Sequence, residues 1–286
     1  MKQHWKRWLA VGVLLGSTQV VVQLGGTGPA QAFYPPPERW MSRTITDSAP
    51  SKTIDVVCPS GQVVYGGGGE VDDGGAHRVM LTELRPVFGS ATFSDPYFEV
   101  TAQEPAAGFD GNWSLTGYAI CGQGGNLLLV SNSDTAGADQ FDIMKVSCPS
   151  GYYGIGAGAA VGGADGRVGL QLVRPSDGRR DSWASGRADT TINLPNWYLT
   201  AYLICSVSYP IGARYVGQVA NTYAASTGCP TGTFAFGAGG GGNTFDSGPS
   251  YLQSVVPTPN LDGVISTMTS TPTGGGMVAV ATCGSP

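Results

Sequence analysis

The chain offers few side chains that could carry out catalysis. Only one histidine lies beyond residue 32, His77, at the end of the turn that begins with Asp72. A Ser-His-Asp or Cys-His centre would have to use this imidazole. The sequence has no Gly-x-Ser-x-Gly motif, and its six cysteines are better explained by disulfides. These counts exclude zinc sites with several His or Cys ligands, and they favour a protein with no catalytic residues and no cofactor.

Carboxylates are the second group that could do chemistry. Acidic residues occur in the loop that follows each of three glycine clusters, at Asp72 and Asp73, at Asp165 and at Asp246. If the fold gathers these loops at one end, Asp72, Asp165 and Asp246 could bind calcium together with backbone carbonyls. The same carboxylates and His77 could instead bind sugar hydroxyls. The alternative is structural, because Asp followed by Gly or Ser forms turns, and His77 would then be an exposed turn residue.

A hydrolase that uses two carboxylates is the catalytic alternative. Its candidate residues lie in the first of three repeats, at Glu70, Asp72, Glu83 and Glu99. No spacing among them identifies one residue as the acid and another as the base or nucleophile.

Two pairs of aromatic residues occupy equivalent places in the first two repeats. Trp113 corresponds to Trp197, and Tyr118 corresponds to Tyr202. Tryptophan and tyrosine stack on sugar rings and anchor interfaces, so Trp113 and Trp197 are candidate ligand-binding residues. The alternative is that each tryptophan packs in the core, because it lies on the same face of its segment as a cysteine.

All these residues belong to a unit that occurs three times. Each unit opens with Cys-Pro-Ser/Thr-Gly, at Cys58, Cys148 and Cys229, and a glycine-rich cluster begins eight residues after each cysteine. A proline follows 27 or 28 residues after the cysteine, and each unit ends at a second cysteine. The closing segments Trp113–Cys121 and Trp197–Cys205 align without a gap. So many markers in register indicate a threefold internal repeat.

The repeat selects one disulfide pattern out of the fifteen that six cysteines allow. Equivalent units are expected to pair their cysteines in the same way, so each opening cysteine should bond to the closing cysteine of its own unit. The predicted bonds are Cys58–Cys121, Cys148–Cys205 and Cys229–Cys283. Each would close a loop of roughly 60 residues, which is worth about 4 kcal/mol in the chain-entropy model.

The segments that carry these residues are predicted to be strands. Along Trp113–Cys121 the two faces alternate with a period of two, which is typical of a β-strand. Further strands are predicted within 54–65, 79–84 and 97–101, so each repeat should supply about four strands and form its own sheet. No segment has a helical period. We predict an all-β fold with threefold pseudo-symmetry, a β-prism of three antiparallel sheets, with the glycine clusters where the units crowd together.

The pattern of the unit resembles that of known proteins. Repeats that open with Cys-Pro-x-Gly, continue with a glycine cluster and close with a Trp…Tyr-x-x-Cys strand are similar to those of many secreted bacterial proteins. They more loosely resemble vitelline membrane outer layer protein, a β-prism of three sheets. The likeness covers most of residues 50–284. It implies the three-sheet fold and brings no known catalytic residue.

The first 32 residues have the features of a secretory signal peptide. Three basic residues precede an apolar stretch, and Ala30-Gln31-Ala32 matches a signal peptidase site. Removing this segment lowers the formal charge from −5 to −8, because it holds three basic residues and no acidic ones. So acidic a chain is not expected to bind nucleic acid or an anionic membrane. No later stretch is apolar enough for membrane insertion.

Together these features predict a secreted protein, extracellular or periplasmic. We expect a signal peptide, a Pro-rich arm and one β domain of three repeats, with the boundaries 1–32, 33–50 and 51–286, the repeats being 51–135, 136–220 and 221–286. The favoured function is non-catalytic: the protein binds an extracellular glycan or forms part of a coat or matrix, where repetition suits weak multivalent binding. The alternative is a secreted carboxylate-dependent hydrolase with its site in the first repeat.

Overall fold

The structure is a computed structural model. It describes residues 35–89, 95–124, 126–137, 140–163, 166–175, 180–188, 196–207, 213–219, 222–242, 248–272 and 276–285. Contacts divide the chain into Met1–Phe33 and Tyr34–Pro286, and every described residue belongs to the second unit. The predicted signal peptide therefore lies outside the described residues. Those residues form strands, turns and loops, and none of them is in a helix that could cross a membrane.

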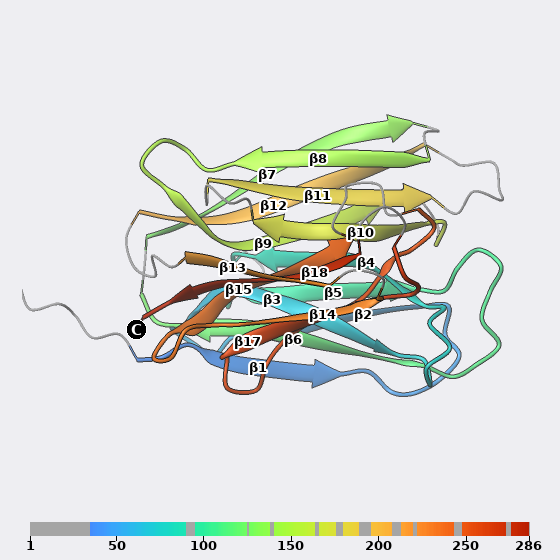
Figure 1. Ribbon diagram of the computed structural model, residues 1–286, viewed down its shortest axis with the longest axis horizontal. Helices are drawn as coiled ribbons and strands as arrows, with labels where there is room; N and C mark the ends of the chain where they lie inside the picture. The colour runs from blue at the N-terminus through green and yellow to red at the C-terminus, as the bar shows by residue number, and fades with distance from the viewer. Residues whose placement is uncertain are drawn as a thin grey trace, which may run out of the picture. The chain divides into compact units, whose positions relative to one another are not determined.

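The first repeat supplies more strands than the sequence predicts. The expected segment 54–65 is divided between two strands, and a further strand follows the closing segment. That last strand begins with an apolar run in which Leu127, Leu129 and Val130 pack against the core, and it continues with exposed polar residues. Its apolar residues therefore do not alternate with the period of two that indicates a strand. In Figure 1 these strands run from blue to green: β2 (Ser51–Val57), β3 (Val63–Asp72), β4 (Met80–Val87), β5 (Tyr97–Gln103), β6 (Ser114–Gly122) and β7 (Leu127–Gly137).

The second and third repeats follow the same order. The second comprises β8 (Phe141–Ser147), β9 (Tyr153–Gly162), β10 (Val168–Pro175), β11 (Asp181–Ala188), β12 (Trp197–Ser206) and β13 (Ala213–Val219). The third comprises β14 (Ala224–Gly228), β15 (Phe234–Gly242), β16 (Leu252–Pro257), β17 (Gly263–Met268) and β18 (Met277–Gly284).

The N-terminal arm supplies the strand that the third repeat lacks. β1 (Glu38–Arg43) pairs antiparallel with β6, just as β7 pairs with β12 and β13 pairs with β18. The segment 33–50, which the sequence predicts to be an extended arm, therefore contains an edge strand of the fold. In the first sheet β1 occupies the edge position that β7 and β13 occupy in the other two sheets.

Each sheet is built from two repeats, which corrects the expectation of one sheet per repeat. The first sheet has the order β1-β6-β3-β16-β17-β14, the second β2-β5-β4-β9-β12-β7 and the third β13-β18-β15-β10-β11-β8. All pairings within them are antiparallel. At the centre of each sheet a glycine-rich strand of one repeat pairs with the proline-containing strand of the preceding repeat in cyclic order. This pairing of strands from different repeats, which we call strand exchange, packs each repeat against both of its neighbours.

The glycine clusters mark a cyclic contact among the three repeats. The register of each glycine-rich strand shifts by one residue just before its cluster, at Tyr65, Ile155 and Phe236. A Cβ on Gly66, Gly156 or Gly237 would overlap the carbonyl oxygen of Phe236, Tyr65 or Ile155 respectively. Each bulged residue thus lies against the first glycine of another repeat. Only glycine allows the three backbones to approach so closely.

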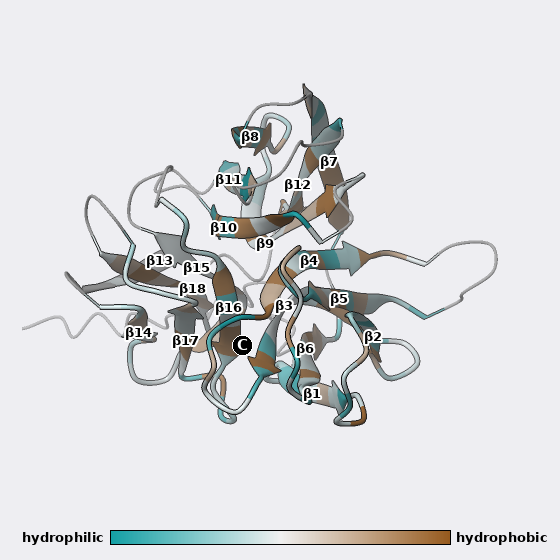
Figure 2. Cartoon of the chain, turned by 90° about the vertical axis from the view of Figure 1, so that its right-hand side faces the viewer, coloured by the Kyte–Doolittle hydropathy of each residue, from teal (hydrophilic) through white to brown (hydrophobic). Residues whose placement is uncertain are grey.

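Neighbouring sheets also meet at their edges. β7 contacts β8, β13 contacts β14, and β1 contacts β2. In Figure 2, which views the strands nearly end-on, these pairs lie at three separate corners, with β3, β9 and β15 between them. Each edge strand therefore has a partner edge beside it, which limits the backbone left open to pairing with other chains.

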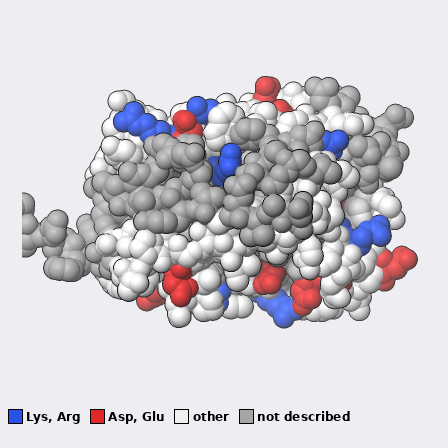
Figure 3. All heavy atoms as spheres, viewed as in Figure 1, with Lys and Arg blue, Asp and Glu red and all other residues white. Residues whose placement is uncertain are grey.

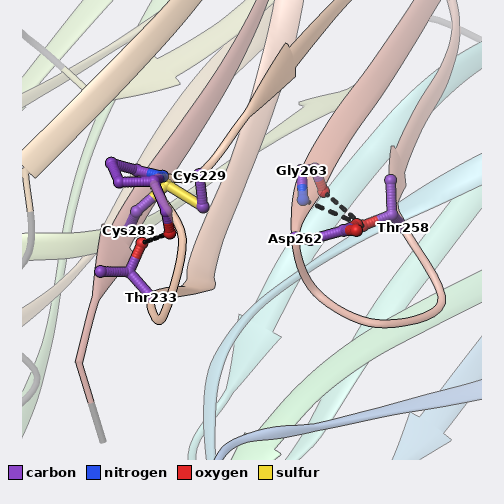
Figure 4. The surroundings of a disulfide bond; sticks show 7 residues. Cys229, Thr233, Thr258, Asp262, Gly263 and Cys283 are labelled. Atoms are coloured by element: carbon purple, nitrogen blue, oxygen red, sulfur yellow. Dashed lines mark hydrogen bonds between the residues drawn. A yellow bond between two sulfur atoms is a disulfide. The ribbon is translucent and has the colours of Figure 1, made fainter.

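The disulfide pattern confirms the prediction from the repeat. Bonds join Cys58 to Cys121, Cys148 to Cys205 and Cys229 to Cys283. Each opening cysteine directly follows the first strand of its repeat, β2, β8 or β14, and the bond ties that point to the closing strand of the same repeat, β6, β12 or β18. Figure 4 shows the third bond, where the Thr233 hydroxyl donates to the carbonyl of Pro230 at 2.7 Å and fixes the turn that follows Cys229.

Candidate functional site

Asp73, one of the predicted ligand-binding residues, shapes the loop after β3. It is only 5% exposed. Its Oδ2 accepts hydrogen bonds from the backbone N–H of Arg78 (2.8 Å) and Val79 (3.2 Å) and from Nε2 of Gln253 (3.1 Å). Its Oδ1 accepts one from the backbone N–H of His77 at 3.2 Å. Both carboxylate oxygens are therefore hydrogen-bonded within the protein. The role of Asp73 is to fix the conformation of the loop that carries His77.

His77 is positioned by the same network. Its φ is +53°, a conformation that few residues other than glycine adopt. Its Nδ1 lies 2.6 Å from Oε1 of Gln253, whose Nε2 donates to the Asp73 carboxylate. A carboxylate can only accept hydrogen bonds, so the NH2 group of Gln253 must face Asp73 and its carbonyl oxygen must face His77. Nδ1 of His77 therefore carries the hydrogen that it donates to this oxygen. In the neutral imidazole, Nε2 is then an acceptor, and among the described residues it has no hydrogen-bond partner.

Asp72 lies beside Asp73 but points away from the core. Its Oδ2 accepts a hydrogen bond from the Arg43 guanidinium at 2.8 Å, and both side chains are at least half exposed. The same guanidinium donates to the Ser114 hydroxyl through Nε at 3.0 Å. β1 and β6 thus place a cation next to the exposed carboxylate at the end of β3.

Glu70 precedes Asp72 by two residues on β3 and shares its face of the first sheet. Its Oε2 accepts the Tyr118 hydroxyl at 2.7 Å. Burial, followed by this hydrogen bond and the Glu70 charge, raises the pKa of Tyr118 above its ordinary range. The Arg39 guanidinium lies 5.0 Å from the centroid of the Tyr118 ring, so the ring is covered by a cation.

These side chains surround a shallow hollow of about 210 Å³, which we call the repeat-one hollow. Strands β1, β3, β6 and β16 and the loop after β3 supply its lining, which includes Arg43, Glu70, Asp72, Asp73, His77, Thr116 and Gln253. It offers carboxylate acceptors, a guanidinium donor, a hydroxyl and an oriented imidazole. Such a set can form paired hydrogen bonds with adjacent hydroxyl groups of a ligand.

The predicted calcium site is only partly visible. Asp165 and Asp246 lie outside the described residues, so their distance from Asp72 stays a prediction. Within the described ranges, no three His, Cys, Asp or Glu side chains are grouped so that they could hold a metal ion. Of the predicted site residues, the structure brings Asp72, Asp73 and His77 together.

The two predicted aromatic ligands are core residues, which corrects their candidacy for binding. Trp113 and Trp197 are both 0% exposed, so neither ring has a face open to a sugar. Trp113 donates from Nε1 to Glu104 Oε1 at 3.1 Å, and the Lys52 ammonium lies 4.8 Å from the centroid of its ring. Each tryptophan packs inward because its strand face is the one that carries the half-cystine.

A second charged group, the carboxyl cluster, lies on the second sheet. It consists of Glu83 and Arg85 on β4, Glu99 on β5 and Asp55 on β2. Arg85 reaches Oε1 of Glu83 with Nε at 2.9 Å and Oε1 of Glu99 with NH2 at 2.6 Å. Asp55 and Arg85 are both register partners of Glu99. The guanidinium therefore pairs with Glu83 and Glu99, and Asp55 lies opposite Glu99 on the neighbouring strand.

This crowding changes the proton affinity of the cluster. Burial, together with repulsion from Glu99, raises the pKa of Glu83 to about 7, although Arg85 and Thr101 oppose the shift. Burial and the Glu99 charge also raise the pKa of Asp55. Near neutral pH the cluster consequently holds a proton that isolated carboxyl groups would release.

The sequence predicted some residues of the repeat-one hollow and of the carboxyl cluster, but it did not predict others. Glu83 and Glu99 stand among the predicted hydrolase candidates, and the hairpin of β4 and β5 makes them neighbours. Arg43 and Gln253 were not predicted, since they reach the repeat-one hollow from the N-terminal arm and from the third repeat. Their contacts with Asp72 and Asp73 span 29 and 180 residues, and no local pattern reports such pairing.

Comparison with models of protein families and with curated proteins gives no match to this chain.

Proposed function

We propose that this protein is a secreted, non-catalytic glycan-binding protein that acts outside the cell, in a coat or matrix or on a surface. The observation that carries the proposal is the repeat-one hollow, where Glu70, Asp72, Arg43 and His77 present hydrogen-bonding groups at one open position. Polar groups in fixed positions are what distinguish one sugar hydroxyl pattern from another.

The charge of the hollow favours a neutral ligand rich in hydroxyls. Asp72 is paired with Arg43, and Glu70 accepts the Tyr118 hydroxyl. Arg43 is the one cation in a lining that also holds Glu70, Asp72 and Asp73, so the hollow has a net negative charge. This charge disfavours an acidic ligand, while the carboxylates can still accept hydrogen bonds from hydroxyl groups. On the described part of the face in Figure 3, Lys and Arg lie scattered beside Asp and Glu. This arrangement fits a sugar better than the continuous basic surface that nucleic acid requires.

The proposed fold is the β-prism that the resemblance to vitelline membrane outer layer protein implies. Its support is the cyclic contact of Tyr65 with Gly156, of Ile155 with Gly237 and of Phe236 with Gly66, together with the contacts between sheets at three corners. Secretion is supported by the three disulfides, because such bonds persist in oxidising compartments.

A glycan array tests the function directly. The protein would be exported with its own leader, purified with its disulfides intact and applied to the array. We expect binding to neutral saccharides, and Glu70→Gln should weaken it at least tenfold, since losing a hydrogen bond to a charged group costs about 1.5–3 kcal/mol. Glu83→Gln, on the second sheet, is the matched control and should bind like the wild type. An array with no binding would refute the proposal and leave a structural coat role.

The carboxyl cluster supports a second candidate, a hydrolase with its site in the first repeat. Glu83, with its pKa raised to about 7, could act as a general acid beside Glu99. Screening polysaccharides for reducing ends tests this candidate. Glu83→Gln and Glu99→Gln should both abolish activity while Glu70→Gln retains it. Absence of cleavage across the screen counts against hydrolysis.

A further inference from the structure

His77 stands between two hollows. On one side is the repeat-one hollow. On the other is a hollow of about 280 Å³, which we call the Tyr251 hollow, and whose lining includes Arg78, Met80, Pro105, Tyr251 and Ser270. His77 contributes to both linings. The two hollows therefore adjoin at His77.

The two hollows differ in chemistry. Charged and polar side chains dominate the repeat-one hollow, whereas Met80, Pro105 and Tyr251 give the other an apolar wall. This wall is held in place, because the backbone N–H of Tyr251 donates to the Thr269 hydroxyl at 3.0 Å. A tyrosine or proline surface suits the apolar face of a sugar ring, while carboxylates and guanidinium suit its hydroxyl edge.

The imidazole between the hollows is fixed in orientation and tautomer. Gln253 and Asp73 hold Nδ1, and the Tyr223 ring lies 5.1 Å from the imidazole, centroid to centroid. The backbone of His77 is held at a positive φ, a cost that the surrounding contacts must offset. What the network leaves available is Nε2, which none of the described residues engages.

We propose that the ligand is a neutral saccharide of at least two sugar units that lies across His77. One unit occupies the repeat-one hollow, the next packs against Tyr251, and Nε2 of His77 accepts a hydrogen bond from a hydroxyl near the linkage. This inference rests on the proposed glycan binding and names its ligand class and length. Each hollow alone is smaller than the roughly 300–1,000 Å³ of usual ligand sites, and only the two together reach that range.

The length of the ligand is tested by titrating a monosaccharide and the matching di- and trisaccharide from an array hit. We expect the wild type to bind the disaccharide at least tenfold more tightly than the monosaccharide. Tyr251→Leu should remove this gain and leave monosaccharide affinity unchanged. Tyr198→Leu is the matched control, because Tyr198 is an exposed tyrosine on β12 of the second sheet. Melting temperatures verify that each variant is folded.

The role of His77 has its own spectroscopic readout. The only other histidine of the sequence is His4, in the predicted signal peptide, so the exported protein should give the two nitrogen resonances of a single imidazole. We expect the tautomer with hydrogen on Nδ1, and a shift of the Nε2 resonance when the disaccharide is added. His77→Asn, which tolerates the positive φ, should weaken disaccharide binding at least fivefold.

The outcomes separate the two proposals. Glycan binding that shows no gain from mono- to disaccharide, or that leaves the Nε2 resonance unmoved, overturns the inference about His77 and keeps the proposed function. Absence of any glycan binding overturns both. Binding to acidic or aminated saccharides alone would also refute the neutral ligand proposed here.

Discussion

The carbonyl oxygen of Tyr65 lies directly against Gly156, at the place where any other residue would carry its Cβ. This contact joins the first and second repeats, and it has counterparts between the second and third and between the third and first. The close approach of three bulged strands is therefore the point at which the repeats depend most on residue identity.

We predict that Gly156→Ala destabilises the protein by about 2–4 kcal/mol, because the added methyl group overlaps backbone that cannot rotate away. Urea denaturation would measure the loss. Gly228→Ala is the matched control, since a Cβ there would lie 3.7 Å from its nearest neighbour, the Asp262 carbonyl oxygen, and its cost should stay within about 0.5 kcal/mol. Equal effects of the two substitutions would contradict the close approach.

The buried carboxylate of Asp73 gives a second prediction. Asp73→Asn replaces one of two accepting oxygens by a donor, so at least one backbone N–H of the loop loses its partner. We expect a loss of about 1–3 kcal/mol and a broadened His77 signal. Asp72→Asn removes only an exposed ion pair, and thermal melting should detect little change. If the neighbouring Asp72 variant were the less stable one, the assigned roles would be reversed.

Stability should depend on pH through Glu83. Its folded pKa is raised to about 7 from 4.5, so between these values the native state holds a proton that the unfolded state has released. Stability therefore falls as pH rises from about 4.5 to 7 and then levels off, with a total change of about 3 kcal/mol. Urea denaturation across this window measures it. Glu83→Gln cannot titrate and should remove most of the slope.

The N-terminal strand should be necessary for the first sheet. A chain that begins at residue 47 lacks β1 and leaves the backbone of β6 unpaired on one side. We expect a lower melting temperature and self-association, because an open edge strand pairs with other chains. Light scattering after size exclusion tests this, and a synthetic peptide of residues 35–46 should restore the monomer. An unchanged monomeric protein would show that β1 is dispensable.

Local sequence patterns predicted several features correctly. The cysteines recur at equivalent places in each unit, and equivalent units are expected to pair them in the same way. This regularity predicted the three disulfides. Two-residue alternation around Trp113 and Trp197 indicated strands with one inward face, and it offered the core as the alternative to ligand binding. Asp72, Asp73 and His77 were found together because they share one turn.

Patterns in the sequence specify the repeated unit: its strands, its turns, its cysteine pairs and the places where only glycine fits. They do not specify how the three units combine. Contacts between distant segments produce the pairing of strands from different repeats and the pairing of β1 with β6. They also bring Arg43 and Gln253 into the hollow that Asp73 and His77 line. Periodicity reports which face of a strand is buried, but it carries no information about which strand lies alongside, because backbone hydrogen bonds are the same for every partner.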